Sequence, residues 1–374
     1  MEKAIFNSYL HIDTARLKAN IEAIISSLPC GTQLIPVLKC DAYGFGAGKV
    51  AAIMEDFPAV QTIALAQVSE GIELRSKGWT RGILITGAAA TEAQRTAAVE
   101  EDIALTAYSA DFIRALAATA RRLQKTVQVH IKINTGLNRL GFRIGDELDE
   151  GIAALKECSD AVRVTGCFSH FTEMETPDEA ETKKQYNEYM SALEALRSAG
   201  IDVGIRHICA SAGYEFHPEM ALDAVRLGRR LYYDNPIRPD GGIVEAASWR
   251  AVITDVRMRK AGERLGYGEG YPITADTKIA MLGVGYGDGL FNKVVAAKAP
   301  VLVNGKRAKL VSCCMDQCFL DVTGIDCSFG DEAVLFGYDE SGNYLPAQEV
   351  ASLMNDEACT LTAALGPRVL RIYE

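Results

Sequence analysis

The sequence predicts an α/β protein with an N-terminal (β/α)8 TIM-type barrel followed by a C-terminal mainly β domain. Three observations support this fold class. The chain has 374 residues, more than one hydrophobic core usually holds, so two domains or a large barrel with an addition are expected. Short apolar runs alternate with helical periodicity up to Pro236, and beyond it apolar and polar residues alternate between Gly, Asn and Asp turns.

The first part of the chain holds eight apolar runs typical of buried strands. Two of the gaps between them, SADFIRALAATARRLQ and TKKQYNEYMSALEALRSAG, have the spacing of amphipathic helices. Eight strands interleaved with helices over about 230 residues are what a closed barrel requires. The runs are TQLIPVLK (32–39), QTIALAQ (61–67), RGILITG (81–87), DIALTAY (102–108), VQVHIKI (127–133), VRVTGCFSHF (162–171), IRHICAS (205–211) and AVRLGRRLYY (224–233).

The second part of the chain has the turn chemistry of an antiparallel β domain. We expect the domains to be residues 1–236 and 237–374, with RPDGG at 238–242 as the connection. The strand-forming stretches beyond it are AVITDVRMRKAGERLGYG, KIAMLGVGYGDG, APVLVNGKRAKLVS and EAVLFGY.

Composition excludes several classes of partner. The net charge of -10 argues against nucleic acid and anionic membranes, which both attract basic surfaces. No apolar tract is long enough to span a bilayer, and the opening MEKAIFNSYLHIDTARL does not resemble an export signal, so a cytoplasmic protein is expected. The ten cysteines contain no CxxC pair, which favours free thiols over disulfides or a metal site.

The stretch IPVLKCDAYGFGAG (35–48) ends the first predicted strand on Lys39. Functional groups of such barrels lie at the carboxyl ends of the strands. Lys39 either packs its stem on the rim with its amine in water, or forms a Schiff base with a carbonyl compound. Three glycines, Gly44, Gly46 and Gly48, would let the backbone approach a ligand closely, and Tyr43 offers a hydroxyl at the same mouth.

VLKCDAYGFGAG resembles the pyridoxal-phosphate lysine signature of the alanine racemase family, whose usual form is V-K-A-N-A-Y-G-H-G. Further family blocks follow in order over essentially the whole chain, which makes the resemblance highly specific. They are KINTGLNRLGF (132–142), CFSHF (167–171), CASAG (209–213), AVRLGRRLYY (224–233), LGYGEGY (265–271), GVGYGDG (283–289) and MDQC (315–318).

The resemblance implies a racemase that uses pyridoxal 5'-phosphate, most simply one that interconverts L- and D-alanine and supplies D-alanine for peptidoglycan. Racemisation removes the α-proton from one face and delivers another to the opposite face, so two bases are needed. By resemblance Lys39 binds the cofactor and is one base, and Tyr267 of LGYGEGY is the other. Tyr271 is the packing alternative within the same stretch. In the family the two bases meet across a head-to-tail homodimer with shared active sites.

Arg226, in DAVRLG, matches the family arginine that faces the pyridine nitrogen. A guanidinium keeps its proton, so it donates to that nitrogen without protonating it fully, and the ring stays a weaker electron sink. Related barrel decarboxylases have an acidic residue here, so Arg226 favours a racemase over a decarboxylase.

The resemblance implies roles for the remaining candidates. Lys132 matches a lysine that is often carbamylated to hold a neighbouring arginine, here Arg139; as two cations they would repel each other, so modification or a surface-facing lysine are the choices. The cofactor-binding candidates are Tyr43, His170, Ser211, Gly228 and Arg229, and the substrate-binding candidates are Arg139, the backbone N–H of Met315, and Asp316, the last two reaching in from the partner chain.

Several departures from the family pattern bear on specificity. Asn134 and Asn138 replace an aspartate and a glycine, and Arg229 stands where a small or apolar residue is usual. Ala363 aligns with a tyrosine of many members or an asparagine of serine racemases, with slightly different spacing, so a wider pocket is expected. A serine or broad-specificity racemase, a decarboxylase of the same fold and a cofactor-binding regulatory protein remain the alternatives.

Overall fold

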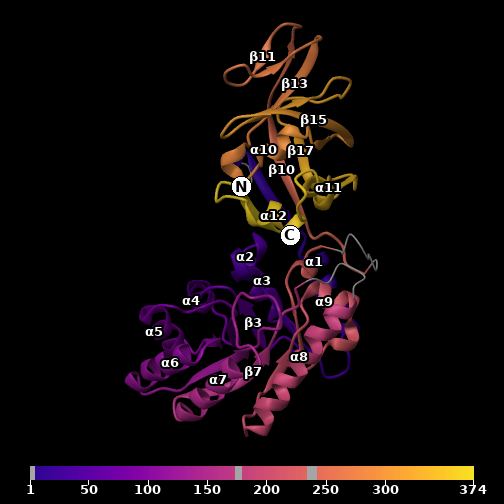
Figure 1. Ribbon diagram of the computed structural model, residues 1–374. Helices are drawn as coiled ribbons and strands as arrows, with labels where there is room; N and C mark the ends of the chain where they lie inside the picture. The colour runs from indigo at the N-terminus through magenta and orange to yellow at the C-terminus, as the bar shows by residue number, and fades with distance from the viewer. Residues whose placement is uncertain (1–4, 173–178, 234–241) are drawn as a thin grey trace. The chain divides into compact units, whose positions relative to one another are not determined.

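The computed structural model describes residues 5–172, 179–233 and 242–374. The chain divides into two compact units, which are described separately (Figure 1). The barrel unit comprises Glu22–Ala42 and Gly46–Leu231. The β unit comprises Met1–Ile21, Tyr43–Phe45 and Tyr232–Glu374. The predicted boundary at 236/237 and most of the predicted connection at 238–242 lie outside the described residues.

The eight predicted barrel strands are confirmed. Strands β3 to β8 form one parallel sheet in sequence order, and β2 pairs with β9 in parallel. The bridge between Val37 and Ala64 joins the end of β2 to β3. The backbone N–H of Arg226 in β9 donates to the carbonyl of Cys209, which follows β8. The strands therefore close into a barrel. The bounds are β2 Gln33–Pro36, β3 Thr62–Leu65, β4 Gly82–Ile85, β5 Ala104–Ala107, β6 Val127–Lys132, β7 Val162–Phe168, β8 Ile205–His207 and β9 Ala224–Leu227.

Helices connect these strands, and neighbouring helices α3 to α7 pack on one another around the barrel (Figure 1). The two predicted helical gaps are confirmed as α6 and α8. The Ser109 hydroxyl starts α6 by accepting the Phe112 N–H, as an N-cap does. The bounds are α1 Thr14–Ser27, α3 Ala47–Met54, α4 Val68–Ser76, α5 Glu92–Glu100, α6 Ala110–Arg122, α7 Asp146–Glu157, α8 Glu179–Ser198 and α9 Ser211–Phe216.

The last predicted barrel strand is shorter than expected. Only its first four residues are extended, as β9; the 3-10 helices η2 (Pro218–Met220) and η3 (Arg229–Leu231) precede and follow it. The chain turns at Gly228, whose carbonyl accepts the Leu231 N–H at 3.0 Å.

The β unit is built on a nine-stranded sheet in the order β18-β17-β14-β15-β16-β13-β10-β1-β19. Asn304 and Gly305, both at positive φ, form the tight turn between β14 and β15. The bounds are β1 Ser8–Ile12, β10 Ala247–Arg259, β13 Thr277–Leu282, β14 Pro300–Val303, β15 Lys306–Cys313, β16 Cys318–Asp321, β17 Glu332–Tyr338, β18 Tyr344–Leu345 and β19 Leu370–Tyr373, with a separate hairpin of β11 Arg264–Leu265 and β12 Tyr271–Pro272, and with helices η4 Tyr286–Asp288, α10 Asn292–Ala296, α11 Ala347–Ser352 and α12 Ala358–Ala363.

Strand β1 was not among the predicted strands. It pairs antiparallel with β10 and parallel with β19, so it joins the beginning of the chain to its last strand. Its residues are almost fully buried, which explains why the first residues of the chain belong to the β unit.

Candidate active site

In the barrel unit, the predicted functional side chains gather at the carboxyl ends of the strands. Because the strands are parallel, their carboxyl ends all lie at one rim of the barrel, and this rim carries the active site in enzymes with such barrels. The residues, with the strand that each ends or follows, are Lys39 (β2), Lys132 and Arg139 (β6), His170 (β7), Ser211 (β8), and Arg226, Gly228 and Arg229 (β9).

Arg226 is the most firmly held of these side chains and is 4% exposed. Its Nη2 donates to the Ser169 and Ile208 carbonyls, at 2.8 and 3.0 Å, and to Nδ1 of His170 at 3.1 Å. Its Nη1 donates to Nδ1 of His207 at 2.7 Å and to the His207 carbonyl at 3.1 Å. Burial lowers the pKa of Arg226 to about 10, so it stays a cation at neutral pH.

These contacts fix the tautomers of three histidines. Because a guanidinium only donates, Nδ1 of His170 and Nδ1 of His207 accept, and their hydrogens sit on Nε2. Nε2 of His207 then donates to Nδ1 of His130, 2.9 Å away. Gly166 leaves room for the His130 ring, since a Cβ there would lie 2.3 Å from its Nδ1. A hydrogen-bonded row therefore runs from Arg226 through His207 to His130.

The three histidines are neutral. Burial, followed by the charge of Arg226, lowers the pKa of His130 to about 4 and that of His207 well below its usual value. Burial lowers the pKa of His170 to about 2, with further contributions from Arg226, Lys132, Arg139 and Lys39. These rings accept and pass on hydrogen bonds at neutral pH without adding charge.

Lys132 is the last residue of β6, 4% exposed, and its Nζ has no hydrogen-bond partner among the described residues. The amine lies 4.6 Å from the centre of the Phe168 ring. Burial, then the charges of Arg226 and Arg139, lower the pKa of Lys132 well below its usual value. The surface-facing alternative for Lys132 is therefore wrong: the side chain is buried, and its surroundings favour the neutral amine over the cation.

Lys39 is half-buried and begins α2 (Lys39–Tyr43), which is a left-handed turn. Residues 40–43 have φ between 53 and 57°, where a side chain other than glycine costs about 1–2 kcal/mol per residue. Such strain persists only where the surroundings enforce it.

Glu70 and Asp41 enforce this turn. One carboxylate oxygen of Glu70 accepts the Cys40 N–H at 2.6 Å, and the other accepts the N–H groups of Ala66 and Gln67 at the start of α4. The Asp41 carboxylate accepts the Ala47 N–H at 2.7 Å, at the start of α3. The position of Lys39 thus depends on two carboxylates that hold the backbone of the turn directly after it.

Two of the three glycines after Lys39 pack closely against other parts of the chain. A Cβ on Gly44 would lie 1.9 Å from the Thr362 carbonyl oxygen, within the β unit. A Cβ on Gly48 would lie 2.3 Å from the Lys77 side chain. Gly44 and Gly46 have φ of 87 and 84°, which glycine adopts without strain.

The departures at Asn134 and Asn138 have a local explanation. The Asn134 side-chain oxygen accepts the N–H groups of Gly136 and Asn138 at 3.1 and 3.0 Å, as an aspartate carboxylate would. Asn138 has a φ of 55°. Asparagine is one of the few residue types other than glycine that adopt this left-handed conformation readily. The loop that carries Arg139, whose side chain is exposed, therefore keeps its turn.

Tyr267, in the β unit, lies at the tip of the β11–β12 hairpin and is 86% exposed. Three glycines with positive φ, Gly266, Gly268 and Gly270, shape this tip, and Gly270 donates its N–H to the Tyr267 carbonyl. Tyr271, by contrast, packs against the buried cluster around Leu265. The two tyrosines of LGYGEGY therefore differ: Tyr267 is exposed to solvent, and Tyr271 packs against a buried hydrophobic cluster.

Met315 and Asp316 are the exposed tip of the loop between β15 and β16, residues 314–317, and the GVGYGDG stretch holds that loop in place. The Tyr286 and Gly287 N–H groups donate to the carbonyls of Cys314 and Met315, at 3.1 and 2.8 Å. A Cβ on Gly285 would lie 2.4 Å from the Cys314 oxygen, so this contact requires glycine.

Tyr43 and Ala363 also belong to the β unit. The ring centre of Tyr43 lies 6.1 Å from that of Tyr232, which stacks on Phe45. Ala363 is exposed as the last residue of α12. The candidates are thus distributed over both units, with Tyr43, Tyr267, Met315 and Asp316 in the β unit.

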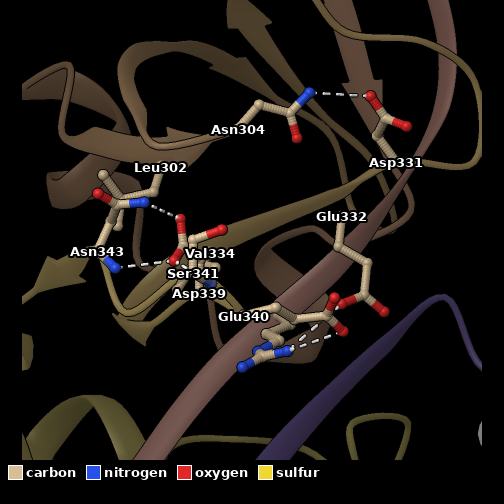
Figure 2. Close-up of a pocket in the computed structure, with 10 residues that line it drawn as sticks. Leu302, Asn304, Asp331, Glu332, Val334, Asp339, Glu340, Ser341 and Asn343 are labelled. Atoms are coloured by element: carbon tan, nitrogen blue, oxygen red, sulfur yellow. Dashed lines mark hydrogen bonds and ion pairs between the residues drawn. The ribbon is translucent and has the colours of Figure 1, made fainter.

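A cavity of about 410 Å³ in the β unit contains none of the predicted site residues. Figure 2 shows that its polar side chains bind one another: Asn304 donates to Asp331, and Asn343 donates to Asp339. Arg250 pairs there with Glu332 and Glu340. The carboxylates of this cavity therefore stabilise the local loops.

Sequence reasoning missed His130, His207, Glu70 and Gly285. The spacing of Gln67 and Glu70 is that of a capping box, which the structure contains, and this signal would have found Glu70. His130 and His207 lie inside predicted strands, at positions where a buried polar residue needs partners, but the sequence does not say which.

The expected free cysteines are confirmed, since all ten are unpaired. No group of metal-ligating side chains occurs within residues 5–172, 179–233 and 242–374. Over the same ranges, no helix is long and apolar enough to cross a membrane.

Comparison with known proteins gives a consistent result. Residues 12–236 match the N-terminal domain of alanine racemase and residues 246–373 match its C-terminal domain. The alanine racemases of Desulforamulus reducens and Methanococcus maripaludis are each 32% identical, over 98% of this chain and 98% of theirs.

Solved structures are similar over the same length. The alanine racemase of Bacillus anthracis with bound L-Ala-P has a TM-score of 0.92 at 26% identity, covering 99% of this chain and 95% of that one. The alanine racemase of Clostridium difficile 630 has a TM-score of 0.89 at 29% identity, covering 98% and 96%. The chain therefore belongs to the alanine racemase family and is an amino-acid racemase, an isomerase.

Proposed function

We propose that this protein interconverts L- and D-alanine with pyridoxal 5'-phosphate, using Lys39 and Tyr267 as bases on opposite faces of the substrate α-carbon. The observation that carries the proposal is the buried, fully charged Arg226 held at the rim beside His170. The chain belongs to the alanine racemase family, and by its resemblance to that family Arg226 would face the cofactor ring.

The donor set at the rim fits this cofactor. None of the Arg226 hydrogen bonds within the described residues uses Nε, so that N–H is available to an acceptor such as a ring nitrogen. The Ser211 hydroxyl, half-buried at the first residue of α9, makes no hydrogen bond within the described ranges. Lys39 would bind the cofactor covalently, His170 would lie beside the ring, and Tyr43, Ser211, Gly228 and Arg229 would bind the phosphate.

The cofactor, when bound, supplies an electron sink that makes the substrate α-proton removable. The nature of the group facing its nitrogen then selects the reaction. Because Arg226 stays protonated and His170 and His207 stay neutral, none of these three groups would deliver a full proton to the ring. The limited electron withdrawal favours return of a proton to the α-carbon, and so racemisation over decarboxylation.

The two bases come from different units in this proposal. The half-buried Lys39 amine takes or returns the proton on one face. Tyr267 takes or returns it on the other, and its pocket must favour the phenolate because an unperturbed tyrosine has a pKa of about 10. Its 86% exposure in the single chain supports a role completed by a partner chain in a head-to-tail homodimer.

Lys132 is proposed to carry a carbamate. A neutral amine attacks carbon dioxide and releases one proton, which converts the buried amine into an anion. The lowered pKa and the absence of a hydrogen-bond partner for Nζ in the described part of the chain both support this reaction. The carbamate would neutralise the repulsion with Arg139 and hold that guanidinium for the substrate carboxylate.

Substrate binding in the β unit is assigned to the Met315 N–H and to Asp316. Their loop is exposed but fixed by Tyr286 and Gly287, so the N–H would be presented in a defined direction. The small, exposed Ala363 supports the second candidate, a racemase that also accepts serine or larger amino acids.

We further propose a cytoplasmic enzyme whose D-alanine enters peptidoglycan synthesis. The ten unpaired cysteines support a reducing compartment, where thiols persist.

Proton NMR in heavy water with cofactor-loaded protein tests this function. We expect the α-proton signal of L-alanine to disappear with the native chain and to persist with Lys39→Ala. The Tyr267→Phe variant should lose conversion to D-alanine, whereas Tyr271→Phe, a matched change in the same hairpin, should keep it. The absence of α-proton exchange on any amino acid in a panel that includes serine would reject racemisation.

A further inference from the structure

Two cysteines face each other across the base of the Met315–Asp316 loop. Cys313 ends β15, Cys318 begins β16, and they are direct partners in the antiparallel register. The Cys314 N–H donates to the Gln317 carbonyl at 2.7 Å. Since hydrogen-bonded and non-hydrogen-bonded pairs alternate, Cys313 and Cys318 form a non-hydrogen-bonded pair.

That position suits a disulfide. In such pairs the Cα atoms lie about 4.5 Å apart, which is within the range of about 4.4–6.8 Å found for disulfides. Directly opposite residues also point to the same face of the sheet. Cys314, the next residue, points to the other face, so the stretch contains one matched pair and one adjacent unmatched thiol.

The two thiols differ in access. Both are free in the structure; Cys313 is half-buried and its Sγ lies 3.0 Å from the Cys314 carbonyl, whereas Cys318 is fully buried. A dissolved disulfide would therefore meet Cys313 first, and Cys318 would complete the exchange from inside. Burial raises the pKa of Cys313 to about 11, so the reaction is slow at neutral pH and reaches completion only under sustained oxidation.

We propose that Cys313 and Cys318 form a reversible cross-strand disulfide by exchange with a small-molecule disulfide such as oxidised glutathione, and that this bond changes substrate binding at the Met315–Asp316 loop. The Cys313 thiolate attacks the small disulfide and releases one reduced thiol. Cys318 then attacks the mixed disulfide at the Cys313 sulfur and releases the second. The protein loses two protons and two electrons, and one small disulfide takes them up to become two thiols.

The bond would act on the loop through its base. A disulfide brings the Cβ atoms to about 3.8 Å, closer than the 4.5–5.5 Å of an unlinked cross-strand pair. The strands therefore move together directly before Cys314 and Met315, whose carbonyls are held by Tyr286 and Gly287. This second part of the inference rests on the proposed role of the Met315 N–H in binding the substrate carboxylate.

The test uses the full-length, cofactor-loaded protein, reduced and then incubated with oxidised glutathione at mildly alkaline pH. Cleavage before Asp316 cuts the chain between the two cysteines, so the flanking peptides stay joined only through the disulfide. We expect joined peptides from the native chain and from Cys314→Ser, the matched control, but separate peptides from Cys313→Ser and from Cys318→Ala. Separate peptides from the oxidised native chain would overturn the inference.

Activity gives the second readout. We expect oxidation to raise the KM for alanine by about threefold or more, with restoration by dithiothreitol and no change in Cys313→Ser. Joined peptides without any change in KM would overturn the effect on the loop. A reduced protein without racemase activity would contradict the proposed function instead, while the peptide result would still decide whether the disulfide forms.

Discussion

At the scale of single residues, the site is controlled by one buried cation and the neutral groups around it. Arg226 donates to three carbonyls and two imidazoles, and a guanidinium is the side chain whose several donors suit such a set. The sequence predicted Arg226 from its motif. It did not predict the row from His207 to His130, because those partners come from strands far apart in the chain.

The buried histidines predict a loss of stability in acid. Folded His130 stays neutral down to pH about 4, whereas an unfolded histidine binds a proton below a pH of about 6.5. Between these values the unfolded state binds more protons, so stability falls as the pH falls, by about 1.4 kcal/mol per pH unit for each such group. His130→Gln should therefore reduce the change of the free energy of unfolding with pH by about 1.4 kcal/mol per pH unit, which corresponds to one proton.

Urea unfolding at pH 5 and pH 6 measures the difference. His130→Asn should give the same reduction in slope, so the result does not depend on how one replacement packs. Parallel pH curves for the native chain and both variants would show that His130 is protonated in the folded protein.

Two residues, Lys132 and Asn138, illustrate which expectations from the family resemblance depended on the structure. Lys132 was expected to be either modified or exposed, and its burial, which the sequence does not show, excludes the exposed alternative. Asn138, which departs from the family glycine, adopts a left-handed conformation that glycine takes up without strain.

At the scale of secondary-structure elements, the left-handed turn of α2 is the strained part of the rim. Glu70 joins this turn to the start of α4 by accepting three N–H groups, including that of Cys40. A glutamine in its place has one acceptor oxygen and one amide group that cannot accept. Glu70→Gln should therefore lower the free energy of unfolding by about 1–3 kcal/mol and reduce cofactor occupancy at limiting cofactor.

Glu73→Gln, one turn further along α4, is the control for this change. Glu73 is 62% exposed and pairs with Lys77, so its replacement should have little effect. Chemical unfolding and absorbance of the bound cofactor measure the two effects. Equal cofactor occupancy in Glu70→Gln and the native chain would contradict the role of Glu70 in positioning Lys39.

Other elements were predictable to different degrees. Helix α6 was recognisable from its periodicity and its Ser109 cap, both local signals. Strand β1 was not, because its five residues pair with β10 and β19, more than 200 residues away, and no local pattern encodes that distance. Strand β9 was predicted too long because three further apolar residues, Leu231, Tyr232 and Tyr233, lie at the end of η3 and directly after it.

At the scale of the whole molecule, the sequence predicted the order and parallel arrangement of the barrel strands. That success comes from the regular alternation of apolar runs and helices, which only a few topologies satisfy. The β unit was predicted only as a class, because its sheet order depends on pairings between distant hairpins and on β1. The chain returns to the β unit at Tyr43–Phe45 through contacts such as that between Gly44 and Arg371, which no local motif indicates.

The two proposed bases belong to different units of the chain. Lys39 belongs to the barrel unit and the exposed Tyr267 to the β unit. We propose that one chain supplies Lys39 and its partner supplies Tyr267. Each single variant, Lys39→Ala or Tyr267→Phe, should then be inactive in conversion of L- to D-alanine.

Mixing these two inactive variants under conditions of subunit exchange tests the claim most directly. A mixed dimer contains one site with both native bases and one with neither. Random pairing makes half of the dimers mixed, so conversion of L- to D-alanine should recover to about a quarter of the native rate. No recovery, with subunit exchange verified by mass spectrometry, would contradict an active site shared between two chains.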